Sequence, residues 1–209
     1  MHRYMIVDPK IRAKRADLLD EPVVIRLNKH FNEEMAEKFA TDMAKAHETG
    51  QTVIPIVLDS FGGEVYSLLD MISQIQNSRL PVATIVEGKA MSAGAMLYGF
   101  GWNGFRYMAE NATLMIHDVS SWHGGKVEEI KADAKETERL HKLIFAMLAK
   151  HLGKKEDYFL DIIHEKGHAE WYLTAKEAKK HGLCNHIGVP EYKVEISLNH
   201  KFGLANAKV

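Results

Sequence analysis

Short runs of aliphatic residues alternate with amphipathic stretches along most of this chain. Three of the runs are typical of short buried strands, at residues 23–27, 53–58 and 82–86. Each is followed by apolar residues at helical spacing, at residues 35–44, 65–75 and 93–98. Repeated strand–helix units predict an α/β fold with a mostly parallel sheet and flanking helices.

The second half of the chain predicts shorter strands and one long helix. Strands are expected at 105–108 and 113–116, and shorter helices at 155–165 and 175–181. The long helix runs from Lys126 to about Leu152, with a charged first half and an apolar second half that includes Ile144 and Leu148. This pattern predicts a projecting helix whose apolar half packs on another subunit.

The segments at the two ends differ from the central part. Residues 1–21 are rich in basic side chains and are expected to form an N-terminal arm. Residues 22–190 are predicted to form one domain, and 191–209 a C-terminal strand and tail, with alternating apolar residues at 192–198.

Composition excludes several classes of function. A net charge of −1 gives no electrostatic reason to expect nucleic acid or an anionic membrane surface as partner. Cys184 is the only cysteine, which excludes an internal disulfide and is compatible with a reducing cytoplasm. No apolar segment has the pattern of a signal peptide or a bilayer span. The 12 histidines show neither H-E-x-x-H spacing nor a C-x-x-C partner, so neither a metal nor another cofactor is expected.

Three candidate chemical groups follow strands of the predicted sheet. Ser92 lies where a strand turns into a helix, so it is either an exposed nucleophile or an ordinary helix N-cap. The Gly62-Gly63 pair is either an anion-binding loop or a tight turn without a ligand. His117 directly follows another strand, and the carboxyl ends of parallel strands meet in one cleft.

Ser92 and His117 suggest a serine nucleophile and its general base. A hydroxyl needs a neighbouring imidazole to take its proton, and the imidazole needs an acceptor that fixes its tautomer. The candidate acids are Glu170, Asp118 and Asp161.

Four ordered motifs resemble the proteolytic subunit of the caseinolytic (Clp) protease family. Residues 59–63 (D-S-F-G-G) resemble that family's N-S-P-G-G loop, and 88–95 (G-K-A-M-S-A-G-A) its serine motif G-x-A-A-S-M-G-A. Residues 114–117 (L-M-I-H) resemble V-M-I-H, and 172–178 (Y-L-T-A-K-E-A) resemble F-x-S-A-x-E-A. The resemblance covers roughly residues 19–187.

The resemblance implies a role for each matching residue. It makes Ser92 the nucleophile and His117 the general base, with an oxyanion hole formed by the backbone N–H groups of Gly63 and Ala93. The family's aspartate corresponds to Glu170, two residues before the aromatic of the last motif.

The resemblance also implies a fold and partners. The expected fold is the Clp protease and crotonase-like fold with a projecting handle over about residues 119–152. Substrates would be peptides or unfolded proteins, cut inside a homo-oligomer of stacked rings in the cytoplasm. An ATP-driven unfoldase would be a further partner.

Several positions depart from the family's pattern. His117-Asp118-Val119 replaces H-Q-P, Phe61 replaces a proline, and Asn185 stands after Gly182-Leu183-Cys184 where the family's G-L-[VI]-D segment has an aspartate. These departures indicate a divergent relative, such as a viral or accessory paralogue.

Other functions remain open on the sequence. They are a phage capsid-maturation type protease of the same fold, a crotonase-like acyl-CoA enzyme, and a non-catalytic subunit paired with an active paralogue. A serine–lysine peptidase resembling signal peptide peptidase A would use Lys89, but His117 in its M-I-H context favours the serine–histidine pair.

Overall fold

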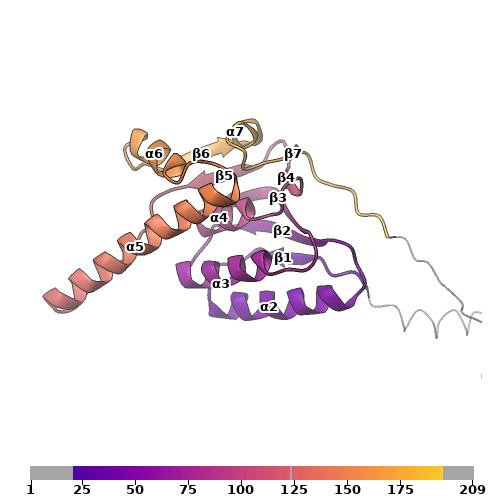
Figure 1. Ribbon diagram of the computed structural model, residues 1–209, viewed down its shortest axis with the longest axis horizontal. Helices are drawn as coiled ribbons and strands as arrows, with labels where there is room; N and C mark the ends of the chain where they lie inside the picture. Colours follow the sequence, from indigo (N-terminus) through magenta and orange to yellow (C-terminus); the bar gives the residue numbers. More distant parts are fainter. Residues whose placement is uncertain (1–20, 123, 195–209) are drawn as a thin grey trace, which may run out of the picture.

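The computed structural model describes residues 21–122 and 124–194, and its centre is a parallel sheet (Figure 1). Five strands lie side by side in the order β1-β2-β3-β4-β7, and every neighbouring pair is parallel. Their bounds are Ile25–Leu27, Ile54–Ser60, Val82–Met91, Arg106–Met108 and His186–Ile187. The expected α/β fold with a mostly parallel sheet is therefore confirmed.

Strand β3 is longer than its aliphatic run and has two neighbours along one edge. Residues 84–86 pair with β4, whereas residues 89–91 pair with β5 (Thr113–Ile116). Strand β5 in turn pairs antiparallel with β6 (Trp171–Thr174). Strand β3 therefore continues beyond the predicted run at 82–86, as far as Met91.

Helices α2 (Glu33–Glu48), α3 (Val65–Gln76) and α4 (Ala93–Gly99) follow the first three strands, as predicted. The side chain of Asn32 caps α2 by accepting a hydrogen bond of 3.0 Å from the N–H of Met35. Helix α4 is fully buried, and it contacts strands β2, β3 and β5 as well as helices α3 and α5.

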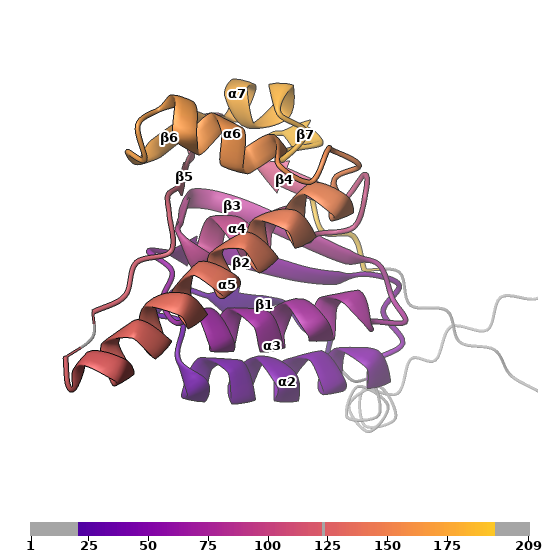
Figure 2. The same cartoon turned by 60° about the vertical axis from the view of Figure 1, so that its left-hand side comes forward.

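The long helix α5 (Val127–His151) projects from the body of the molecule at its N-terminal end (Figure 1). The segment that leads from β5 to the start of α5 runs alongside this projecting half (Figure 2). The two are in contact, because Ser121 Oγ lies 2.9 Å from Thr137 Oγ1. The Tyr66 hydroxyl on α3 donates a hydrogen bond of 2.8 Å to Glu136.

The second half of α5 packs on its own chain, which corrects one expectation. Ile144 is 1% exposed and Leu148 is 0% exposed. A Cβ atom on Gly99 of α4 would lie only 2.5 Å from Leu148 Cδ1, so the two helices meet closely. The prediction that this apolar half needs another subunit was wrong, because the core of the same chain already covers it.

Two short helices complete the described fold, α6 (Tyr158–Glu165) and α7 (Ala175–Lys180). Thr174 and Glu177 form a capping box at the start of α7. Tyr192 and Val194 are exposed and lie in no strand, so the expected C-terminal strand is absent at 192–194. Residues 195–209, the expected arm at 1–20 and His123 lie outside the described residues.

Candidate active site

Ser92 occupies a strained turn between β3 and α4. Its φ of 54° and ψ of −125° are unusual for a residue with a side chain. Its backbone N–H donates a hydrogen bond of 2.7 Å to the carbonyl oxygen of Met115 on β5. The hydroxyl makes no capping hydrogen bond to α4, although Ser92 stands at the N-cap position. The ordinary N-cap interpretation is therefore wrong, and the hydroxyl is free to face the pocket.

The Gly62-Gly63 loop packs directly against this turn. A Cβ atom on Gly62 would lie 2.6 Å from Met91 O and 2.8 Å from Ala93 N. A Cβ atom on Gly63 would lie 2.2 Å from Phe31 O. With φ values of 95° and 155°, both positions require glycine.

Gly63 and Ala93, whose N–H groups are the predicted oxyanion donors, both line the pocket together with Ser92. Gly63 forms a parallel bridge with Phe31, and the bridge uses the carbonyl of Gly62 and the N–H of Glu64. The N–H of Gly63 itself therefore points to the opposite side, where this residue lines the pocket. Ala93 begins α4, so its N–H has no partner within the helix. These N–H groups correspond to the predicted oxyanion hole, which stays a prediction.

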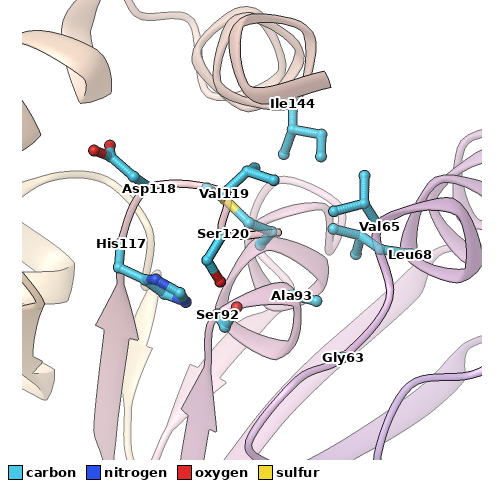
Figure 3. A pocket seen from close by; sticks show the side chains of 11 residues that line it. Gly63, Val65, Leu68, Ser92, Ala93, His117, Asp118, Val119, Ser120 and Ile144 are labelled. Carbon is cyan, nitrogen blue, oxygen red and sulfur yellow. The ribbon is translucent and has the colours of Figure 1, made fainter. Parts of the chain in front are cut away.

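His117 lies beside Ser92 in a pocket of about 60 Å³ (Figure 3). It directly follows β5, which is paired with the end of β3, and its ring is directed towards Ser92. Val65, Leu68 and Ile144 form an apolar wall of this pocket. The structure therefore brings together the serine, the histidine and the glycine loop that the sequence suggested.

Glu170 directly precedes β6, and His117 directly follows β5, the strand that pairs with β6. The pairs Met115–Tyr172 and Ile116–Trp171 lead, one step further, to His117 opposite Glu170. Directly opposite residues of an antiparallel pair direct their side chains to the same face. The exposed Glu170 carboxylate accepts a hydrogen bond of 2.8 Å from the Tyr172 hydroxyl, which raises the pKa of Tyr172. Its predicted role as the acid remains untested.

The other candidate groups are placed differently. Asp118 points away from His117 (Figure 3), and its Oδ2 lies 2.6 Å from His168 Nδ1. Asp161 is an exposed residue of α6 and does not line the pocket. The Lys89 ammonium lies 2.9 Å from Asp59 and 4.6 Å from the centre of the Phe61 ring, so Lys89 is engaged outside the pocket.

Sequence reasoning missed two histidines beside this site, His141 on α5 and His168 before β6. His141 Nε2 lies 3.7 Å from Asp118 Oδ1, and His168 contacts Asp118 Oδ2. Both are far from Asp118 in sequence, and neither belongs to a motif. The one indication in the sequence was the position of His141, which lies on the same face of the predicted helix as Ile144 and Leu148.

No cluster of three or more metal-ligating side chains occurs within residues 21–122 and 124–194. In the same part of the chain, none of the helices combines the length and the apolar character that crossing a membrane requires.

Fold and site together define a class: an α/β protein whose parallel sheet presents a serine, a histidine and a glycine loop in one pocket. The chain belongs to the Clp protease family, since the family model described as Clp protease matches residues 10–191. The resemblance drawn from the four motifs is thereby confirmed.

A curated relative from Frankia casuarinae, named "ATP-dependent Clp protease proteolytic subunit 2", is 36% identical to this chain over 135 residues. The aligned region covers 64% of this chain and 60% of that relative. The chain thus spans about 60% of the length of the relative that it matches.

Proposed function

We propose that this protein is a serine endopeptidase with Ser92 as nucleophile. The strained turn that presents the Ser92 hydroxyl beside His117 carries this proposal. A serine held in this way, with a base at the end of the next strand, suits attack on a carbonyl.

The reaction follows from the residues of the pocket. His117 takes the hydroxyl proton as Ser92 Oγ bonds to the peptide carbonyl carbon, and the carbonyl oxygen becomes an oxyanion. The N–H groups of Gly63 and Ala93 stabilise this charge. His117 then gives the proton to the leaving amine as the C–N bond breaks, and water hydrolyses the acyl-enzyme. Glu170 orients the imidazole and stabilises its protonated form.

The substrate is an extended peptide or an unfolded protein. The apolar wall at Val65, Leu68 and Ile144 favours an apolar side chain next to the cleaved bond. The pocket is small and contains few charged groups, which suits a peptide better than a coenzyme-linked acyl group.

We further propose a closed homo-oligomer in the cytoplasm, of the stacked-ring type, that encloses this site. The projecting half of α5 offers a surface for such assembly, because Val127 is 67% exposed and Trp122 is 90% exposed. The Frankia relative is named as a subunit of an ATP-dependent protease. An ATP-driven unfoldase is therefore the proposed partner, and neither nucleic acid nor a membrane is one.

The test combines active-site labelling with hydrolysis. A fluorophosphonate should label the wild-type chain at Ser92, and a fluorogenic peptide with an apolar residue at the cleaved position should be cut. Ser92→Ala should lose both signals, whereas Ser121→Ala, on the segment beside α5, should keep them. Equal hydrolysis by wild type and Ser92→Ala would contradict the proposal.

A further inference from the structure

Asp118 joins three segments of the chain next to the candidate active site. It follows His117 directly, and the two side chains point in different directions (Figure 3). Its Oδ2 lies 2.6 Å from His168 Nδ1, and its Oδ1 lies 3.7 Å from His141 Nε2. Asp118 therefore contacts helix α5 through His141 and the segment before β6 through His168.

The contact with His168 lies at a residue whose backbone has a positive φ. His168 has a φ of 61°, which is uncommon for a residue other than glycine. Such a conformation persists only where the surroundings enforce it. His168 lies two residues before Glu170, so its position determines how the chain enters β6. Asp118 thereby influences the placement of the proposed acid.

The contact with His141 reaches the wall of the pocket. The N–H of Val119, a residue that lines the pocket, donates a hydrogen bond of 3.4 Å to His141 Nδ1. A ring nitrogen accepts a hydrogen bond only when it carries no proton. His141 must then be neutral with its proton on Nε2, the nitrogen that faces Asp118 Oδ1.

The free carboxylate oxygen supports this arrangement. Asp118 Oδ1 is buried and has no hydrogen-bond partner within the described residues. A buried acceptor without a partner is costly. A shift of less than 1 Å would bring the Nε2–H group of His141 into hydrogen-bonding distance.

We propose that Asp118 and neutral His141 are positioning residues for the peptidase reaction, which hold Val119 and the strand carrying Glu170 against helix α5. This inference rests on the proposed function. It assigns Asp118, first considered as the catalytic acid, a role that acts through its neighbours.

Protonation of His141 would remove the arrangement. Its pKa is lowered by burial, an effect that Asp118 opposes and that the nearby His164, His168 and Lys142 reinforce. Acidification places a proton on Nδ1, which can then no longer accept from Val119. Activity therefore requires two neutral histidines, His117 as the base and His141 as the positioning group.

The experiment uses two variants of His141 that separate its roles. His141→Asn places an amide oxygen near the position of Nδ1, so it can accept from Val119 but does not titrate. His141→Leu removes the acceptor. The matched control is His151→Asn, because His151 is on the same helix and its pKa is also lowered by burial.

In the full-length protein, log(kcat/KM) for a fluorogenic peptide is measured against pH. The wild type should approach a slope of about 2 on the acid side, because two protonations stop the reaction. His141→Asn should approach a slope of about 1, whereas His151→Asn should keep the wild-type slope. His141→Leu should lose kcat roughly 10- to 100-fold at neutral pH with little change in KM.

The role of Asp118 is tested by a matched pair of aspartate variants. Asp118→Asn should lower kcat in the same way, and Asp42→Asn, which removes a half-buried aspartate on α2 that pairs with Lys38, should not. If circular dichroism shows that His141→Leu does not fold, the slope of log(kcat/KM) against pH for His141→Asn still tests the inference. A wild-type slope of 1 that His141→Asn leaves unchanged overturns the inference. Failure of a fluorophosphonate to label wild-type Ser92 would instead reject the proposed peptidase.

Discussion

The backbone N–H of Ser92 donates a hydrogen bond of 2.7 Å to the carbonyl oxygen of Met115. Met115 belongs to β5, and His117 follows this strand immediately. A single backbone hydrogen bond therefore connects the turn of the proposed nucleophile to the strand of the proposed base. The distance between serine and histidine depends on the pairing of β3 with β5.

The strain at Ser92 leads to a prediction about stability. Glycine tolerates a positive φ better than residues with a side chain do, so Ser92→Gly should be more stable than Ser92→Ala by about 1 kcal/mol. The melting temperature should be about 2–4 °C higher for a chain of this size. Both variants should be inactive. The control Ser73→Gly, within helix α3, should instead lower the melting temperature relative to the wild type. Equal melting temperatures for Ser92→Gly and Ser92→Ala would show that the turn is unstrained.

Glu170→Gln tests the acid of the proposed triad. Loss of the carboxylate should lower kcat by up to ~10⁴-fold, because the imidazole loses the group that fixes its tautomer. Asp161→Asn is the control and should retain activity. Tyr172→Phe removes a competing hydrogen bond to Glu170 and should keep kcat at least at the wild-type level. Full activity of Glu170→Gln would exclude it as the acid.

The two-glycine loop predicts a contrast between Gly63→Ala and Gly104→Ala. Both residues have positive φ, but a Cβ atom on Gly104 meets nothing within 4 Å, whereas one on Gly63 would lie 2.2 Å from Phe31 O. Gly104→Ala should cost about 1–2 kcal/mol of unfolding free energy and keep activity. Gly63→Ala should lose hydrolysis, because relieving the clash moves the proposed oxyanion donor. Hydrolysis rates and chemical denaturation distinguish the two.

Assembly should depend on the projecting half of α5. Ile130 is 42% exposed there, so Ile130→Glu should lower the native mass and the peptidase rate together. Thr41→Glu, on the exposed side of α2, serves as the charge control. Ile144→Glu should instead unfold the chain, since Ile144 is 1% exposed. An unchanged native mass for Ile130→Glu would remove this surface from the proposed interface.

Stability should fall on acidification below about pH 6.5. Burial lowers the pKa of His141, His151 and His181 in the folded protein, so the unfolded chain binds more protons in this range. The free energy of unfolding therefore rises with pH until these groups are neutral in both states. Melting temperatures from about pH 5 to about pH 7.5 should show this, and His151→Asn should flatten the dependence. A pH-independent melting temperature would contradict the assignment.

The sequence predicted the elements whose local signals agree with their tertiary surroundings. Asn32 marks the start of α2, and the stripe that includes Ile144 identifies α5 as a helix. These apolar residues do not reveal what covers them. The sequence of a buried helix face is the same whether it packs on its own chain or on another subunit. Strands β6 and β7 escaped prediction because they are short and are defined by distant partners.

Some features of the candidate active site could be predicted from the sequence and others could not. Ser92, His117 and Gly63 lie in contiguous motifs, so their chemistry is visible in the sequence. Neither the strain at Ser92 nor the free hydroxyl could be predicted, since both depend on pairing between β3 and β5. The placement of Glu170 opposite His117 depends on strand register, and the contacts of Asp118 with His141 and His168 depend on packing between three separate elements.

The two neighbours of β3 along one edge have a mechanical consequence. Ser92 directly follows β3 of the central sheet, whereas His117 and Glu170 flank the ends of the β5–β6 pair, which joins β3 through three residue pairs, 89–91 with 113–115. A small rotation of the β5–β6 pair would change the separation of serine and histidine and would carry His117 and Glu170 together. Amide exchange in β5 and β6 should accordingly be faster than in β2, even in a fully folded chain. The proposed serine and histidine therefore lie on opposite sides of the contact between β3 and β5, and this short contact sets the distance between them.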